Sequence, residues 1–321
     1  MTVSKALRDE PDISTATKNR IRDIAQKTGY VPNISARGLR TRQTNQSGLI
    51  ISALSNPMYT RTFMAIEEQA YEMGYEIIVA QTLNNPEREE TCIRRLLARQ
   101  VDGLFIRPVY RADPKVTIYE ELKKHHTPAV ILGHRALFCS DFPNVETDDM
   151  ESAKALTKHL LNLGHRHIAC LTGPTFAPWA QERYEGYRRG LIDHGIEVDD
   201  KLVFQAGATI EEGAKASLEF IQENPKATAM VAANDLVAIG AANTLLDQGV
   251  RIPEDLSITG FGNVLSAEYF RVPLTTVRQP KYRRGLAAMD AMQKLLRGET
   301  AGTKRLPAEL SIRKSTNAPA A

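Results

Sequence analysis

The feature that most constrains the fold is an alternation, from Gly48 onward, between short apolar runs and longer segments with apolar residues every three or four positions. The short runs predict strands, several of them apolar enough to be covered on both faces. The predicted strands are 48–53, 76–81, 103–107, 129–133, 167–172, 227–232 and 256–260. The predicted helices are 63–73, 88–99, 118–125, 150–163, 181–194, 210–222 and 236–248. This repetition indicates parallel sheets built from right-handed crossovers.

The chain is long enough for two such lobes, because its 321 residues are about twice the ~150 of a typical domain. The strand pattern weakens near residues 145–149. We therefore predict an α/β fold with two doubly wound parallel-sheet lobes in series.

The composition argues against export and membrane insertion. Cys92, Cys139 and Cys170 are far apart and lack the spacing of metal ligands, so we expect reduced core thiols in a cytoplasmic protein. No apolar run reaches the ~18 residues of a membrane helix, and the polar N-terminus does not resemble a signal peptide.

Charge is distributed unevenly along the chain. Nine lysines and arginines stand against four acidic residues between Met1 and Ser47, an excess of five positive charges, whereas the whole chain carries +3. The rest of the chain is therefore mildly acidic. A basic head of this kind is either a phosphate-binding module or an ordinary solvated surface.

The first forty-odd residues do not follow the strand and helix alternation. Residues 14–27 predict a helix with Ser14 as its cap. Pro32 then enforces an extended backbone, and residues 34–39 predict a helix too short to be stable alone. Residues 41–47 are polar and predict a linker. A short helix between a basic module and a linker needs a partner, and DNA is a candidate.

Eight stretches, in this order, resemble the lactose/galactose repressor (LacI/GalR) family of bacterial transcription regulators. They are Thr2-Val3-Ser4-Lys5-Ala6-Leu7; Thr28-Gly29-Tyr30-Val31-Pro32-Asn33 with Ala36-Arg37 and Leu39; Ser55-Asn56-Pro57; Val101-Asp102-Gly103; Leu163-Gly164-His165-Arg166; Asn234-Asp235; Ile252-Pro253-Glu254-Asp255; and Leu274 to Pro280. Each stretch alone is a weak signal, but the set covers essentially the whole chain.

The resemblance implies a helix-turn-helix head, a hinge helix and a two-lobed core like that of periplasmic sugar-binding proteins. The implied division is a partial head at 1–29, hinge helix and linker at 30–47, an N-terminal lobe at 48–146 plus about 279–306, a C-terminal lobe at 147–278 plus about 307–316, and a tail at 317–321. Thr2 to Lys5 match the middle of the recognition helix. Either the start codon is misassigned and about twenty residues lie upstream, which we favour, or the product is truncated with impaired specific binding.

The resemblance also implies a homodimer that binds a palindromic DNA operator. The implied DNA-binding residues are Thr2, Ser4, Lys5, Asn33, Ala36, Arg37 and Leu39. Lys5 can donate to guanine in the major groove, and Leu39 matches the hinge leucine that wedges into the minor groove.

A small effector, a sugar or a sugar acid, is expected between the lobes. The implied effector-binding residues are Met58, Tyr59, His134, Arg135, Trp179, Arg183, Asn234 and Asn263. Trp179, the only tryptophan, is predicted in a loop, where stacking on a ring explains it better than core packing. Gly262 and Asn263 stand where the family generally has an aspartate, which favours an effector bearing a carboxylate or phosphate.

Two other classes of protein fit less well. An enzyme is not expected, because the chain has no HExxH, GxSxG, P-loop or GxGxxG motif, and no metal or other cofactor is expected. A stand-alone sugar-binding protein without specific DNA binding remains the alternative, although such a protein would not need the hinge-like segment at 30–47.

Overall fold

The computed structural model describes residues 2–7, 9–30 and 43–320. The chain divides into two compact units, Met1–Asn45 and Gln46–Ala321. In the described part of the chain, no helix is both long and apolar enough to cross a membrane.

The first unit holds α1 (Thr2–Leu7) and α2 (Thr15–Thr28). The predicted helix and cap are confirmed: Ser14 Oγ accepts the Thr17 backbone N–H at 3.4 Å, and Gly29 ends the helix with a left-handed φ of 64°. The side chain of Ala6 is fully buried. The expected hinge helix at 34–39 lies outside the described residues.

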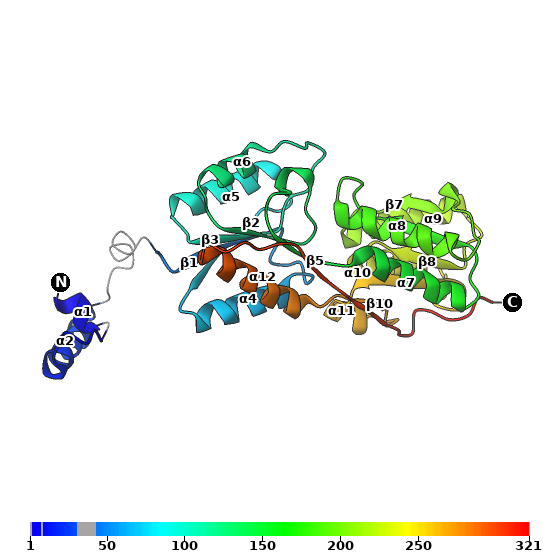
Figure 1. The fold of residues 1–321 in the computed structure, drawn as a ribbon. Helices are drawn as coiled ribbons and strands as arrows, with labels where there is room; N and C mark the ends of the chain where they lie inside the picture. The colour runs from blue at the N-terminus through cyan, green and yellow to red at the C-terminus, as the bar shows by residue number, and fades with distance from the viewer. Residues whose placement is uncertain (1, 8, 31–42, 321) are drawn as a thin grey trace. The chain divides into compact units, whose positions relative to one another are not determined.

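The second unit begins with a six-stranded sheet whose spatial order is β11-β5-β4-β3-β1-β2. Its strands are β1 (Gln46–Ile51), β2 (Glu76–Gln81), β3 (Gly103–Ile106), β4 (Ala129–Leu132), β5 (Asn144–Thr147) and β11 (Lys304–Leu306), all paired in parallel. Helices α4 (Thr60–Glu72) and α12 (Lys281–Leu296) cover one face, and α5 (Pro86–Ala98) and α6 (Thr117–Lys124) cover the other (Figure 1).

The strands of this first lobe are apolar on both faces because both faces are covered. Ile50 packs with Ile93 and Ile118 on the α5 and α6 side, while the adjacent Leu49 and Ile51 pack with Ile66 and other residues on the α4 and α12 side. Successive side chains of a strand point to opposite faces, so continuous apolar runs are required.

A second sheet has the matching order β12-β10-β9-β8-β6-β7. Its strands are β6 (Ile168–Thr172), β7 (Val203–Gln205), β8 (Ala229–Ala232), β9 (Ser257–Gly262), β10 (Thr275–Arg278) and β12 (Glu309–Ser311), of which β12 alone runs antiparallel to its neighbour. Its two faces pack against α7 (Asp149–Asn162) with α8 (Pro178–Ile192), and against α9 (Ile210–Glu223) with α10 (Asp235–Asp247). A short α11 (Leu265–Glu268) follows β9.

The chain passes between the two sheets three times. It leaves the first after β5, returns from β10 into α12, and leaves again between β11 and β12 (Figure 1). Groups at these crossings, such as Asp149 and Gln279, therefore stand beside both lobes.

The predicted fold class of two parallel-sheet lobes is confirmed. Each of the seven predicted strands and seven predicted core helices has a counterpart in the structure. Five strands, β5, β7, β10, β11 and β12, were not predicted because each has only one or two apolar residues and forms no apolar run. Helix α12 was also missed, although its buried Ala288, Met289 and Met292 are spaced as a helix face requires.

Candidate ligand-binding site

A cavity of about 330 Å³ lies between the two lobes, at the carboxyl ends of the strands of both sheets. Open parallel sheets bind ligands at this edge. The lining residues from the first lobe are Ser52, Asn56, Met58, Tyr59, Asn84, Arg107, Pro108, Val109, Tyr110, Gly133, His134, Thr147 and Arg284. Those from the second lobe and the crossings are Asp149, Pro174, Phe176, Ala177, Trp179, Arg183, Ala208, Thr209, Glu212, Asn234, Leu236 and Gln279.

The wall of the second lobe is organised around an ion pair between Arg183 and Asp149. Arg183 donates Nε and Nη2 to Asp149 Oδ2 at 2.9 and 2.7 Å, and the carboxylate is almost fully buried. Gln279 donates to Asp149 Oδ1 at 3.1 Å. Burial lowers the pKa of Arg183, and the attraction of Asp149 opposes that shift. Arg183 is thus both a cavity-lining cation and a fixed part of the lobe crossing.

Two aromatic rings line the cavity beside Arg183. The guanidinium carbon of Arg183 lies 4.7 Å from the ring centre of Trp179, a cation–π distance. Phe176, which was not predicted, is about half exposed on the same segment. Trp179 lies in the first turn of α8 and not in the predicted loop, and it lines the cavity, where a ligand ring could stack on it.

The wall of the first lobe is organised around Arg107, immediately after β3. Arg107 donates Nε to the Tyr59 hydroxyl at 3.2 Å and Nη1 to the Tyr110 hydroxyl. Tyr110 in turn donates to the backbone oxygen of His134 at 2.7 Å. Burial tends to raise the pKa of the Tyr59 phenol, but the charge and hydrogen bond of Arg107 outweigh burial and lower it.

A further arginine, Arg284, reaches the same wall from α12. It donates Nε and Nη2 to the Thr62 hydroxyl at 3.3 and 3.0 Å. Burial, with repulsion from Arg107, lowers the pKa of Arg284 to about 10. The residues that line this wall are thus rich in positive charge.

Asn234 lines the cavity, but its side chain is already used. Its Oδ1 accepts the Val237 backbone N–H at 2.9 Å and caps α10, and its Nδ2 donates to Ala208 O at 3.0 Å. We expected Asn234 to offer a donor and an acceptor to ligand hydroxyls, whereas the fold uses both.

Two of the predicted effector-binding residues do not line the cavity. Arg135 is exposed and donates to Ser140 O at 2.7 Å and Phe142 O at 3.4 Å. Asn263 turns away in a left-handed conformation, φ 55°, and accepts from Arg313 at 2.7 Å. In both cases a neighbouring backbone or side-chain group holds the residue outside the cavity.

The glycine that stands where the family generally has an aspartate has a steric reason. Gly262 has a φ of +132°, and a Cβ there would lie 2.5 Å from Met58 Sδ. The positive φ strains any larger residue at position 262, and the end of the Met58 side chain, which lines the cavity as predicted, would also have to move.

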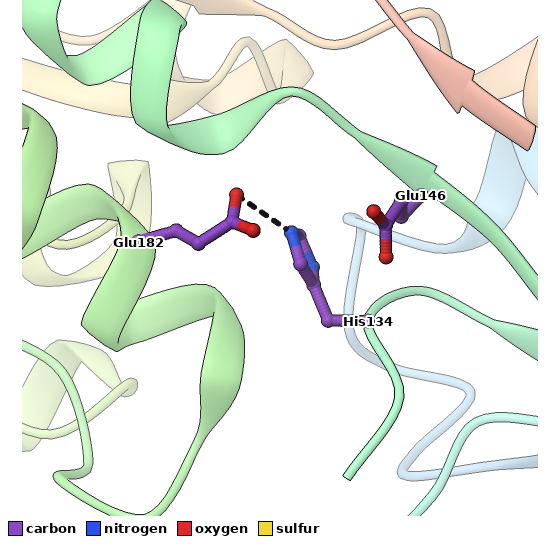
Figure 2. Close-up of side chains that lie close together, drawn as sticks. All are labelled: His134, Glu146 and Glu182. Atoms are coloured by element: carbon purple, nitrogen blue, oxygen red, sulfur yellow. Dashed lines mark hydrogen bonds and ion pairs between the residues drawn. The ribbon is translucent and has the colours of Figure 1, made fainter. Parts of the chain in front are cut away.

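Two further carboxylates and a histidine join the lobes at one edge of the cavity. Figure 2 shows the imidazole of His134 between Glu182 and Glu146, with His134 Nε2 at 3.1 Å from Glu182 Oε2. Ligand atoms of the three residues lie within 4.8 Å of one another, close enough to hold a metal ion. The guanidinium of Arg305 already contacts the carboxylates of Glu182 and Glu146 and supplies the positive charge. The cluster is therefore an ion-pair contact between the lobes.

The structure describes few of the predicted DNA-binding residues. Thr2 and Lys5 lie on α1, with Thr2 exposed and Lys5 paired to Asp12, and Ser4 lies on the same helix. The other predicted contacts, Asn33, Ala36, Arg37 and Leu39, lie outside the described residues.

Several cavity residues were missed from the sequence. Arg107 follows directly on β3, and Asp149 begins α7 two residues after β5. A charged side chain close behind a strand is the signal that could have found them. Arg284 was missed because it lies in α12, a helix that the sequence analysis did not predict.

Two family models match the chain. The model of bacterial regulatory proteins of the lacI family matches residues 1–33, and the model of the periplasmic binding protein-like domain matches residues 157–316.

Individual relatives match over almost the whole length. The transcriptional regulator DegA of Bacillus subtilis is 30% identical over 98% of this chain and 94% of its own. The lac repressor dimer bound to operator and the anti-inducer ONPF matches with a TM-score of 0.86 and 25% identity, over 99% of this chain and 95% of that one. The complex of the regulator CelR with cellobiose matches with a TM-score of 0.78 and 26% identity, over 97% and 94% of the two chains.

Proposed function

Because the chain belongs to the lacI family of bacterial regulatory proteins, it is a DNA-binding transcriptional regulator, and we propose that it is a repressor controlled by a small sugar-like effector. It acts as a homodimer on a palindromic operator. The related lac repressor has been solved as a dimer on its operator, and the related CelR with the sugar cellobiose. Its place of action is the bacterial cytoplasm, and it carries out no catalysis.

The observation that carries the effector part of this proposal is the cavity between the lobes. Its lining comes from strand ends of both sheets, and its polar groups include Arg107 from one lobe and Arg183 from the other. A ligand that contacts both walls binds the closed arrangement more tightly than the open one. The difference between these two affinities sets how far it shifts the protein toward the closed arrangement.

Opening and closing of the two lobes would act on the contact that Glu182 makes with His134 and Arg305. Glu182 lies on α8 of the second lobe, whereas His134 follows β4 and Arg305 lies on β11 of the first. Opening the cavity breaks this contact, and closing it reforms the ion pairs. A coupling of about 1–3 kcal/mol between effector and operator is typical of such regulators.

The DNA side of the proposal rests on the match of residues 1–33 to the lacI family model. Thr2, Ser4 and Lys5 on α1 contact the major groove. Asn33, Ala36, Arg37 and Leu39 contact the minor groove and its backbone, with Leu39 as the wedge.

Selection of DNA by the full-length gene product tests the proposal. Bound fragments should share an inverted repeat, and Leu39→Ala should lose more affinity for it than for random DNA, because only the operator centre is kinked. A screen of sugars and sugar acids by Trp179 fluorescence should find a ligand that also alters operator binding. Equal binding to all duplexes, or ligand binding with no effect on DNA, would favour a stand-alone sugar-binding protein.

A further inference from the structure

The charges that line the cavity do not balance between its two walls. Three arginines line it, Arg107, Arg183 and Arg284, against the carboxylates of Asp149 and Glu212. Asp149 pairs with Arg183. Glu212 accepts the backbone N–H groups of Ala208 and Thr209 at 2.7 and 2.9 Å, where it completes the cap of α9. Both carboxylates are thus occupied on the second lobe.

Arg107 and Arg284 of the first lobe have no carboxylate within ion-pair distance among the described residues. The hydrogen-bond acceptors found for them are the hydroxyls of Tyr59, Tyr110 and Thr62 and the backbone oxygen of Leu132. Uncharged oxygens satisfy N–H groups but do not neutralise a buried charge. Arg284 is only 8% exposed, so water compensates little of its charge.

Both guanidinium groups are held in place before any ligand arrives. Arg107 lies over the rings of Tyr59 and Tyr110, 5.7 and 4.8 Å from their centres. The Thr62 hydroxyl accepts from Arg284 and itself donates to Lys281 O at 3.0 Å. Fixed guanidinium forks match the geometry of carboxylate and phosphate, and they lose little entropy on binding.

On the opposite side of the cavity, one polar atom has no hydrogen-bond partner among the described residues. The Oε1 atom of Gln279 is buried and accepts no hydrogen bond from the part of the chain that the structure describes, while its Nε2 is fixed by Asp149. This oxygen can accept a hydrogen bond from a ligand hydroxyl.

We propose that Arg107 and Arg284 form an anion subsite, and that the effector is a small polyhydroxylated acid whose carboxylate or phosphate they bind. This inference rests on the proposed function and narrows the class of effector. The acid group lies on the first lobe, and the carbon skeleton lies against Trp179 of the second. The acid group then neutralises the arginines of the first lobe, and contact of the same ligand with Trp179 favours the closed arrangement of the lobes.

Fluorescence of Trp179 in the full chain measures binding of four probes: inorganic phosphate, D-gluconate, D-glucose 6-phosphate and, as the uncharged control, D-glucose. We expect phosphate and at least one acid to bind about tenfold or more tighter than glucose, which corresponds to about 1.4 kcal/mol. Binding should weaken with rising salt, because the attraction is between charges. The relative affinities for gluconate and glucose 6-phosphate show whether the subsite prefers a carboxylate or a phosphate.

Substitutions then locate the subsite. Arg107→Gln and Arg284→Gln should each weaken binding of the acid about tenfold or more, and Arg284→Lys should recover part of it. Arg283→Gln is the matched control, because Arg283 is the exposed neighbour on the same helix and should leave affinity unchanged. The thermal midpoint of each variant without ligand shows whether it folds.

The inference is overturned if no anion binds up to about 10 mM, or if glucose binds as tightly as the acids. It is also overturned if both folded glutamine variants bind the acid like the parent. A neutral sugar that releases the operator would leave the proposed function standing while removing the anion subsite. Loss of all ligand and operator binding would remove both.

Discussion

The two lobes share one strand order but hold their cavity-facing arginines in opposite ways. Each sheet places its first five strands in the same sequence, and only the last strand differs, parallel in the first lobe and antiparallel in the second. In the second lobe Arg183 is neutralised by Asp149. In the first lobe Arg107 and Arg284 meet only hydroxyl and carbonyl oxygens among the described residues.

This difference indicates that Arg183 has a structural role, whereas Arg107 and Arg284 are available to bind a ligand. A buried ion pair holds the second lobe to the crossing, so its arginine contributes to folding. Buried arginines without a carboxylate cost stability, and proteins retain such groups where a ligand needs them.

The largest effect is expected from breaking the ion pair of the second lobe. Arg183→Ala leaves the buried carboxylate of Asp149 without its cation and should lower the free energy of unfolding by about 3–5 kcal/mol. Urea unfolding of the full chain measures it. Arg189→Ala, an exposed position on the same helix, is the control. A loss below about 1 kcal/mol would show that Asp149 is compensated by other groups.

The arginine of the first lobe should behave in the opposite way. Arg284→Met removes a buried charge that is repelled by Arg107, so we expect stability without ligand to rise, by about 1 kcal/mol. Arg283→Met should change the unfolding midpoint little. A marked loss of stability in Arg284→Met would mean that this arginine is structural, like Arg183.

The contact between the lobes should depend on pH through Glu182. Burial raises the pKa of this carboxyl, but His134 and Arg305 outweigh burial and lower it below its usual value. The ionised form therefore stabilises the native state above the unfolded pKa of 4.5, and this contribution is lost as the pH falls through the lower native value. Glu182→Gln should cost about 1 kcal/mol at pH 7 and less at pH 3, where part of the carboxylate is protonated in the native state.

Unfolding by urea at both pH values checks this prediction. The control is Glu185→Gln on the same helix, whose partners Arg188 and Arg189 belong to the same lobe. An equal cost of Glu182→Gln at both pH values would show that the ionised carboxylate does not stabilise the contact.

The smallest effect is expected at Asn234, whose side chain caps α10. Asn234→Asp keeps the cap but replaces the donor to Ala208 O with an oxygen and should cost about 0.5 kcal/mol, whereas Asn234→Ala loses both hydrogen bonds and should cost about 1 kcal/mol. Thermal unfolding of the two variants separates these values. If the aspartate adds a negative charge to the second wall, it should also weaken binding of an acid. Equal stability of the two variants would show that the cap contributes nothing.

Local patterns in the sequence determined the fold class and the place of the cavity. Runs such as those around Leu49 and Leu171 are buried on both faces and could hardly be anything other than covered parallel strands. Met58, Tyr59, His134, Trp179, Arg183 and Asn234 all line the cavity because strand ends of parallel sheets meet at one edge.

Tertiary structure alone decided how those side chains are used. Arg183 and Asp149 are 34 positions apart, and Gln279 is 130 positions from Asp149. No local sequence pattern therefore predicts the hydrogen bonds among these three residues. Arg135 and Asn263 have the right chemistry, but long-range packing directs them elsewhere. The local sequence specifies which elements form and where their ends meet, because apolar periodicity is a property of neighbouring residues. Only the folded chain decided which charges are neutralised and which remain free for a ligand, because that depends on distances between residues far apart in the chain.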